Sequence, residues 1–396
     1  MKIAYFTDTY LPNVDGVVTC LLAYRAELEK RGHEVYIFSP GSKRDKAENK
    51  DKRVYYFTSA SFKPYPDYRI SLFPFLSAVK LAKEINPDLI HSHGIATTGL
   101  AAIQCAQKLK VPAIASFHTM APEATHYLTK NEGMQKFLED VAWKYLKWYY
   151  ASFDPVLAPS GYTADILKAH GIGNVTVLPS GIDSKAFAKA DGEAVRKKHG
   201  LGKKKVILHA GRMVMEKNLD LLIDEAQSII NKQPNAKFVL VGKGPAEEYY
   251  KGRVQAKGLG DYFIFAGFVD RKELPEYYAA ADVFAFPSKF DTQGLVVLEA
   301  MASGTPAVVP TKSASAELIE EGKTGYTFAE PVDFREKVLL AMERKEEMGK
   351  AAREAARKYD KEITVGKLEE LYKMKVEANN SKANAAKNGK NGKEKK

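Results

Sequence analysis

The sequence alternates short β-rich apolar runs with segments of helical pattern, and it does so in two successive series. Such alternation is typical of parallel β-sheets that are covered by helices. Helical segments such as 17–31 and 94–108 separate the runs of the first series. The expected strands read KIAYF, EVYIF, RVYYF, DLIHS, AIASF, PVLAP and VTVLP, and then KVILHAG, KFVLVG, YFIFAG, VFAFPS and PAVVP. Two series predict two doubly wound, Rossmann-like α/β domains rather than one large sheet.

The boundary between the two series falls in PSGID at 179–183. We therefore expect one domain over residues 1–180 and a second over 181–360, with a helix over 361–376 that packs back across their junction. Open α/β sheets bind ligands at the carboxyl ends of their strands, so two such sheets facing each other predict a substrate cleft.

The last residues, 377–396, contain six lysines and two glutamates but no large apolar residue. This composition predicts a disordered basic tail. A tail of this kind could bind RNA or anionic lipid, but a solubilising role is the simpler interpretation.

Composition limits the class of protein. The chain has 396 residues, of which 45% are apolar and 28% charged, as in an ordinary soluble globular protein. It contains no apolar run of about 18 residues, so we expect no membrane-spanning helix. Met1 leads directly into KIAYFTDTY, which predicts no signal peptide. Cys20 and Cys105 form no C-x-x-C pair and are expected to be buried thiols in a reducing cytoplasm.

The stretch DTQGLVVLEAMASGTPAVVP, from Asp291 to Pro310, combines two carboxylates with a strand-to-helix turn. The backbone N–H groups at the start of the helix, from Gly294 and Leu295 onward, suit an anion such as phosphate. Eight helical residues between Asp291 and Glu299 would span about 12 Å, whereas the carboxyl pair of a glycosidase lies about 5–10 Å apart.

A nucleotide sugar fits this layout better. Asp291 would bind the sugar hydroxyls, the helix start the diphosphate, and Glu299 the ribose. The alternative is an acidic residue that caps the helix together with a surface glutamate.

A second motif, HAGRMVMEKN at 209–218, follows the first strand of the second series. Arg212 and Lys217 could hold a diphosphate there, the first as a planar fork and the second as a point charge. Such cations stabilise a departing nucleoside diphosphate as a metal would. The chain has no D-x-D pair, so we expect no metal, and it has no P-loop or G-x-G-x-x-G motif, which weakens ATPase and dinucleotide-binding interpretations.

Taken together, GRMVMEKN and DTQGLVVLEAMASGTPAVV resemble the donor half of the retaining glycosyltransferases of family 4, which have the GT-B fold. FTDTYLPNVDGVVTCLLAYRAELEKRGHEVYIFSP, HSHG, SFHT and LPSGID resemble other parts of the same family, so the resemblance covers roughly residues 1–375. The chain departs from the family in two places. Asp291 stands where the family usually has glutamate, and Asp15-Gly16 stands where it often has Gly-Gly.

The resemblance implies roles for individual residues. Gly16 would let the backbone approach the diphosphate, and Arg212 and Lys217 would hold it. Asp291 would contact the sugar, with Gly294 and Leu295 on sugar and phosphate and Glu299 on the ribose. No carboxylate nucleophile stands out in the sequence, and the family is thought to react on one face, with the leaving phosphate helping to take the acceptor proton.

Three residues of the first half have competing interpretations. His118, in SFHT, would lie near the transferred sugar as a catalytic residue, or it is a hydrogen-bonded structural histidine. Asp8, at the end of the first strand, is a candidate on the acceptor side, or it caps the neighbouring turn. His91 and His93 alternate along one strand without a nearby third ligand, which makes a metal pair improbable.

Two segments could contact a membrane surface. The stretch from Phe62 to Phe75 mixes aromatic residues and prolines with Lys63 and Arg69, a combination that suits a lipid headgroup interface. The helix at 143–150 is also aromatic and basic, although burial of its aromatic residues in the domain core is the better interpretation.

The sequence TQGLVVLEAMA most resembles the glycolipid-forming branch of the family, which glucosylates diacylglycerol. The resemblance therefore implies a metal-independent hexosyltransferase that uses UDP-glucose on a lipid acceptor, without a cofactor, at the inner face of the membrane.

Other interpretations remain open. They are transfer from GDP-mannose, transfer to a phosphoinositol, glycan or small-molecule acceptor, a non-catalytic nucleotide-sugar-binding protein, an epimerase of the same fold, and an RNA-binding protein that uses the basic tail. We expect no nucleic-acid partner.

Overall fold

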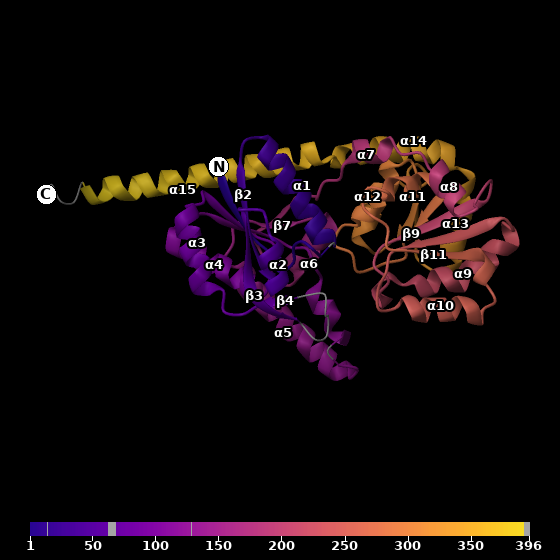
Figure 1. The fold of residues 1–396 in the computed structure, drawn as a ribbon, viewed down its shortest axis with the longest axis horizontal. Coiled ribbons are helices and arrows are strands. Elements are labelled where there is room, and N and C mark those ends of the chain that lie inside the picture. Colours follow the sequence, from indigo (N-terminus) through magenta and orange to yellow (C-terminus); the bar gives the residue numbers. More distant parts are fainter. Residues whose placement is uncertain (14, 62–68, 128, 392–396) are drawn as a thin grey trace. The chain divides into compact units, whose positions relative to one another are not determined.

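The computed structural model describes residues 1–13, 15–61, 69–127 and 129–391. The chain divides into two compact units (Figure 1). The first unit comprises 1–159, 163–179 and 362–396, and the second comprises 160–162 and 180–361. Each unit is built on its own β-sheet with helices on both faces, which confirms the predicted fold class of two doubly wound α/β domains.

The first unit contains an eight-stranded sheet in the order β4-β3-β2-β1-β5-β6-β7-β8. All neighbouring strands are parallel except β3 and β4, which are antiparallel. Seven of these strands were expected from the sequence, and β4 was not. The strands are β1 (Lys2–Phe6), β2 (Glu34–Gly41), β3 (Val54–Ser61), β4 (Arg69–Ser71), β5 (Leu89–Ser92), β6 (Ala113–Ser116), β7 (Val156–Ala158) and β8 (Val175–Val177).

Helices cover both faces of this sheet, and β1 shows how. Ile3 and Tyr5 pack against α1 and α15, whereas Ala4 and Phe6 belong to the core that α3 and α4 form on the opposite face. Parallel strands buried on both faces read as continuous apolar runs, which is how β1 reads. The helices are α1 (Gly16–Lys30), α2 (Lys43–Glu48), α3 (Phe75–Ile85), α4 (Thr97–Leu109), α5 (Glu132–Tyr150), α6 (Gly161–Ala169) and α15 (Lys361–Asn391), with a 3-10 helix, η1 (Ala121–Tyr127).

The second unit contains a six-stranded parallel sheet in the order β11-β10-β9-β12-β13-β14. Its first five strands in the chain match the second series of the sequence, and β14 was not expected. The strands are β9 (Lys205–Ala210), β10 (Ala236–Val241), β11 (Phe263–Gly267), β12 (Val283–Ala285), β13 (Ala307–Pro310) and β14 (Gly325–Phe328).

The helices of the second unit likewise form two layers. One core packs the sheet against α7, α8, α11, α12 and α14, and the other packs it against α9, α10 and α13. The helices are α7 (Ser184–Ala188), α8 (Glu193–Lys198), α9 (Leu219–Lys232), α10 (Glu247–Ala256), α11 (Leu274–Ala280), α12 (Leu295–Ala302), α13 (Pro331–Glu343) and α14 (Lys345–Ala356), with the 3-10 helices η2 (Met215–Lys217), η3 (Gly260–Tyr262), η4 (Ala314–Leu318) and η5 (Arg357–Tyr359).

A short segment, Ser160–Tyr162, belongs to the second unit although it was expected in the first domain. The Ser160 hydroxyl donates to the carbonyl of Thr292 over 2.7 Å, and the backbone N–H groups of Gly161 and Tyr162 donate to the carboxylate of Glu317. These tertiary contacts have no signature in the sequence, which explains the difference.

The C-terminal helix differs from expectation in length. It was expected over 361–376, followed by a disordered tail, but α15 continues to Asn391 and packs on the first unit (Figure 1). Its first half is anchored by the buried side chains of Val365, Leu368 and Tyr372. The residues beyond are rich in alanine, lysine and asparagine, and the Asn379 side chain donates to the carbonyl of Lys110 over 3.1 Å. The residues after 376 therefore continue the helix in spite of their low apolar content, because the helix is already anchored by the residues before them.

Candidate active site

Each sheet has one topological switch point, where the strand order reverses. In the first unit it lies between β1 and β5, and in the second between β9 and β12. Ligands of doubly wound sheets bind at the carboxyl ends of the strands at such points. The sequence-predicted site residues follow these strands in both units, so we describe each switch point in turn.

At the switch point of the second unit, Lys217 and Asp291 form an ion pair. Lys217 ends η2, just after β9, and its Nζ lies 2.7 and 2.9 Å from the two carboxylate oxygens of Asp291, which follows β12. Nζ also lies 5.2 Å from the ring centroid of Phe286. Arg212 is half-buried in the same loop after β9. Two residues predicted from separate motifs are therefore brought together, with a second cation in the same loop.

The start of α12 is open to an anion. Gly294 precedes the helix in a left-handed conformation, with φ of 86°, and a side chain there would lie 3.0 Å from Cβ of Ser315. Glycine is therefore required at this turn. Among the described residues no side chain caps α12, so the N–H groups of Leu295 and Val296 keep their capacity to donate, whereas that of Val297 donates to the carbonyl of Gly294 over 2.9 Å. The predicted helix start is present and suits phosphate.

Glu299 lies inside α12 and is almost completely buried. One carboxylate oxygen is 3.0 Å from a guanidinium nitrogen of Arg271, and the other accepts a hydrogen bond of 3.0 Å from the hydroxyl of Tyr278. Burial raises the pKa of Glu299, and the contacts with Arg271 and Tyr278 act in the opposite direction. The alternative of a surface glutamate is therefore wrong.

The turn between Asp291 and α12 is fixed by Gln293. Its side-chain oxygen accepts from the N–H of Ser180 over 2.9 Å, and its side-chain nitrogen donates to the carbonyl of Ser180 over 3.0 Å. The motifs LPSGID and DTQG are thus joined by a two-bond clamp, which holds the loop that carries Asp291.

At the switch point of the first unit, Asp8 binds backbone. One carboxylate oxygen accepts from the N–H groups of Ile95 and Ala96, over 2.6 and 2.8 Å. Burial raises the pKa of Asp8, and these two hydrogen bonds act against the rise. Asp8 thus caps the loop before α4, as in the structural interpretation, and its role toward an acceptor stays a prediction.

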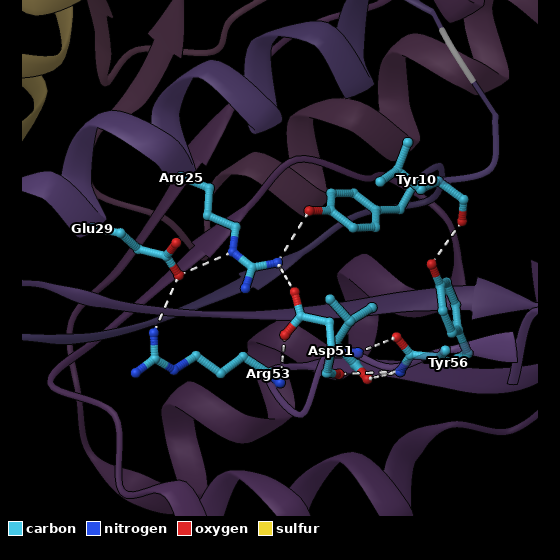
Figure 2. Close-up of polar contacts among 9 residues, drawn as sticks. Tyr10, Arg25, Glu29, Asp51, Arg53 and Tyr56 are labelled. Atoms are coloured by element: carbon cyan, nitrogen blue, oxygen red, sulfur yellow. Dashed lines mark hydrogen bonds and ion pairs between the residues drawn. The ribbon is translucent and has the colours of Figure 1, made fainter.

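The loop between β1 and α1 is held by a polar network (Figure 2). The Arg25 guanidinium contacts the Tyr10 hydroxyl over 3.4 Å and Asp51 over 2.7 Å, while the Tyr56 hydroxyl donates to the carbonyl of Leu11 over 2.7 Å. Glu29 joins this network through Arg25 and Arg53. The loop is therefore fastened both to α1 and to β3.

Gly16 begins α1 directly after this loop. Asp15 caps the helix by accepting from the N–H of Val18, over 2.8 Å, and receives a hydrogen bond from the hydroxyl of Thr9 over 3.1 Å. A Cβ added to Gly16 would meet no described atom within 4 Å. Open space beside Gly16 is what close approach of a ligand to the backbone requires.

His118 follows β6 and lies against His93. Nδ1 of His93 is 2.9 Å from Nε2 of His118; the His93 ring is buried and His118 is half-buried. Burial lowers the pKa of His118 to about 4, so the ring is neutral near pH 7. His118 is therefore hydrogen-bonded, as its structural interpretation requires, and this contact does not exclude the catalytic one.

The structure describes only one of the two cations that were predicted on the acceptor side. Lys63 lies outside the described residues. Arg69, in β4, donates to the hydroxyls of Ser59 and Ser61 and to the carbonyl of Ser59, over 2.8 to 3.2 Å. These bonds fasten β4 to β3 and leave Arg69 less able to act as a free cation.

Neither metal clusters nor membrane spans emerge from the described part of the chain. Within it, no group of three or more His, Cys, Asp or Glu side chains is arranged to hold a metal ion. No described helix combines the length and apolar character needed to cross a membrane. Cys20 and Cys105 are buried and form no disulfide, as expected.

Comparison with known proteins agrees with this geometry. The model of glycosyltransferase family 4 matches residues 14–186, and the model of glycosyl transferases group 1 matches residues 191–359. An alpha-monoglucosyldiacylglycerol synthase of Streptococcus pneumoniae is 31% identical, over 86% of this chain and 78% of its own length. The chain belongs to glycosyltransferase family 4.

Further relatives and solved structures extend this result. A GDP-mannose-dependent alpha-mannosyltransferase of Corynebacterium glutamicum is 28% identical to this family 4 glycosyltransferase, over 87% of this chain and 80% of its own length. The structure of Anabaena HepE in complex with UDP superposes with a TM-score of 0.76 at 19% identity, over 94% of this chain and 100% of that one. Its likeness supports the GT-B fold.

Sequence reasoning missed several residues that contact the candidate site residues. Arg271 and Tyr278, the partners of Glu299, lie in no motif, although a buried carboxylate predicts a cationic partner somewhere in the fold. Gln293 was quoted within DTQG but given no role. His93 was considered only as a metal ligand, whereas its position two residues after His91 and beside SFHT was the available signal.

Proposed function

We propose that this family 4 glycosyltransferase moves a hexose from a nucleotide sugar, UDP-glucose in the first instance, to a membrane lipid such as diacylglycerol. The observation that carries the proposal is the grouping of Lys217, Asp291, Arg212 and the uncapped start of α12 at one switch point. That grouping offers two cations and backbone N–H groups to a diphosphate, and a carboxylate to sugar hydroxyls.

The proposed reaction retains the anomeric configuration. The acceptor hydroxyl oxygen forms a bond to the anomeric carbon, the bond from that carbon to the phosphate oxygen breaks, and the acceptor proton passes to the departing phosphate. Arg212, Lys217 and the start of α12 stabilise the charge that develops on the leaving diphosphate. Because these groups supply positive charge, we propose that no divalent metal or other cofactor is required.

The first unit contributes the remaining proposed contacts. Gly16 admits the diphosphate to the backbone at the start of α1, and His118 contacts the transferred sugar. In the second unit, Glu299 binds the ribose, held in place by Arg271 and Tyr278.

A lipid acceptor is supported by relatives and by exposed apolar residues on α5. The relatives that suggest it are named alpha-monoglucosyldiacylglycerol synthase. Met134, Phe137, Val141 and Trp148 are exposed, and their spacing of three, four and seven residues puts them on one face of the helix. Trp143, Tyr149 and Tyr150 are buried, as expected for the core side, but Trp148 is 59% exposed.

The charge on this helix suggests the kind of surface. Lys136, Lys144 and Lys147 are exposed on α5, together with Asp140. Near the start of α3, Phe73 and Leu76 are 87% and 86% exposed. Exposed aromatic and basic residues of this kind favour peripheral attachment to an anionic membrane surface, which we propose at the cytoplasmic face.

Mannose transfer is the second candidate, because GDP-mannose-dependent mannosyltransferases are also among the relatives. Mass spectrometry of lipid and soluble products decides between the two. The protein is incubated with UDP-glucose, GDP-mannose and other sugar nucleotides, with diacylglycerol vesicles or soluble acceptors, in the presence and absence of EDTA. Hexosyl-diacylglycerol from UDP-glucose, formed equally with EDTA, is the expected product.

Four results would contradict parts of this proposal. Product only from GDP-mannose overturns the donor, equal product on soluble acceptors overturns the lipid, and loss of product with EDTA overturns metal independence. A product of inverted anomeric configuration, detected by NMR, overturns retention.

A further inference from the structure

Three histidine side chains lie in contact at the carboxyl ends of β5 and β6 in the first unit. The ring centroids of His91 and His93 are 3.8 Å apart, and those of His93 and His118 are 5.2 Å apart with nearly parallel planes. The main chain of the middle residue is held as well, because the backbone N–H of His93 donates to the carbonyl of Phe6 over 2.7 Å. The three imidazoles therefore have defined partners rather than free rotation.

All three rings are neutral near pH 7. Burial lowers the pKa of each, to about 4 for His118 and well below the usual value for His91 and His93, where the neighbouring histidines lower it further. A neutral imidazole carries one proton on one of its two nitrogens. The question is which nitrogen of each ring holds it.

The outer ring, His91, is fully occupied elsewhere. Its Nδ1 lies 2.6 Å from the hydroxyl of Tyr372, and its Nε2 lies 2.8 Å from the hydroxyl of Ser116. A hydroxyl can donate or accept, so either tautomer of His91 is satisfied. His91 therefore imposes nothing on the other two rings.

His93 has no such freedom. Its Nε2 is buried and has no hydrogen-bond partner among the residues that the structure describes, while its Nδ1 faces Nε2 of His118 at 2.9 Å. A proton on Nε2 would be a buried N–H without an acceptor. A proton on Nδ1 leaves only an unused lone pair on Nε2 and donates to His118. Buried N–H groups without an acceptor are rarer in proteins than buried acceptors without a donor.

We propose that His93 is a positioning residue that donates from Nδ1 to Nε2 of His118 and thereby holds His118 as the tautomer protonated at Nδ1. In this state His118 has no accepting nitrogen left. It acts as a neutral hydrogen-bond donor to a hydroxyl of the sugar and does not serve as a general base. The catalytic part of this inference rests on the proposed function, in which the leaving phosphate takes the acceptor proton.

Nitrogen NMR of the full-length protein tests the tautomer without any substrate. The eight histidines are labelled with ¹⁵N, and the spectrum of His118→Asn identifies the signals of His118. Ring nitrogens with and without a proton differ strongly in chemical shift. The proposal expects a protonated Nδ1 and an unprotonated Nε2 for His118, and the reverse pattern overturns it whether or not the protein transfers sugar.

Two substitutions of His93 separate hydrogen bonding from packing. In His93→Asn the amide nitrogen takes the place of Nδ1 and keeps a donor toward His118, whereas His93→Phe keeps a ring without a donor. We expect transfer turnover within about twofold of normal in the first and lowered about five- to tenfold in the second, since one neutral hydrogen bond is lost. Because Phe is larger than His, the unfolding temperature of both variants is measured as well, and a loss of turnover in His93→Phe without a matching loss of stability assigns the effect to the hydrogen bond.

The matched control is His91→Asn, which removes a buried ring whose two nitrogens hydrogen-bond to Tyr372 and Ser116. It should lower the unfolding temperature and leave the ¹⁵N pattern of His118 unchanged. Equal turnover of His93→Asn and His93→Phe, with His118 protonated at Nδ1 in both, would overturn the role of His93. If the tautomer is as inferred but no sugar nucleotide is turned over, the proposed function fails and the assignment of the proton stands.

Discussion

The two switch points of this molecule have the same architecture and opposite chemistry. In the second unit, cations and carboxylates meet in pairs, Lys217 with Asp291 and Arg271 with Glu299. At the switch point of the first unit, His93 and His118 are neutral and the carboxylate of Asp8 is bound to backbone. One fold therefore supports both a charged site suited to a diphosphate and a neutral site suited to hydroxyls.

This difference implies a division of labour. Charged groups gain most from a ligand that carries charge, whereas neutral donors discriminate between hydroxyls by geometry. Substitution of Arg212 or Lys217 in the second unit should therefore affect the leaving group, and substitution of His93 or His118 in the first unit should affect the orientation of the sugar. The following experiments test this contrast.

The largest effect is expected for the cations of the second unit. Lys217→Ala or Arg212→Ala should each lower turnover by about ten- to a hundredfold, because a charge-assisted contact to phosphate contributes about 1.5–3 kcal/mol. Turnover with UDP-glucose is measured together with circular dichroism to confirm folding. Arg253→Ala is the control, since Arg253 pairs with Asp220 and Asp224 on the outer helices. Near-normal turnover in both test variants would remove the charged site from the mechanism.

Asp291→Asn tests whether Asp291 contacts the sugar or the nucleotide end of the ligand. We expect turnover to fall about tenfold, from the loss of a charged acceptor for sugar hydroxyls. Affinity for UDP, measured by calorimetry, should stay equal or rise, because Lys217 loses the carboxylate that it contacts in the structure. A collapse of UDP affinity would instead put Asp291 at the nucleotide end of the ligand.

Membrane binding tests whether the exposed apolar residues of the first unit have a function. Phe137→Ser with Trp148→Ser should weaken binding to anionic vesicles about fivefold, if partial insertion of the two side chains contributes about 1 kcal/mol in total. Removal of residues 377–396 should weaken it in part, and salt should weaken it throughout. The control is Phe268→Ser, which changes a similarly exposed aromatic residue of the second unit. Equal binding of all variants would leave the α5 face without a role.

The smallest effect concerns the attachment of α15 to the first unit. Glu369 contacts Lys373, His33 and Arg31, and these partners lower its pKa to about 2. A carboxylate whose pKa is depressed on folding stabilises the fold above its unfolded pKa, about 4.5, and this contribution is lost as the pH falls from about 4.5 toward 2. Glu369→Gln should lower the melting temperature by about 2–4 °C at pH 7 and by less at pH 3. An equal shift at both pH values would assign the effect to packing instead.

The sequence was sufficient to predict twelve strands of the two sheets, because parallel strands that are buried on both faces are continuous apolar runs. It was not sufficient for β4 and β14. Arg69–Ser71 and Gly325–Phe328 are three and four residues long and carry no such run, so only their pairing partners make them strands. The prediction of disorder after residue 376 was wrong for a related reason. The composition of residues 377–396 does not indicate that they follow a helix whose earlier residues are anchored.

The candidate site divides in the same way. Arg212, Lys217, Asp291 and Glu299 were found because each lies in a local motif after a strand. Arg271 and His93 act on site residues that are distant in sequence, 28 and 25 residues away, and no local pattern encodes such a contact. The structure was needed to find the partners, although not to find the candidate positions themselves.

The order of the chain has a consequence for how the protein is made. The first unit begins at Met1 and is completed only by α15, because the second unit is inserted between them. On the ribosome, the sheet surface that Val365, Leu368 and Tyr372 cover emerges before the second unit and stays exposed until the second unit has been synthesised. The first unit is thus the later of the two to acquire its complete core, and a polypeptide that stops near residue 360 would release it unfinished.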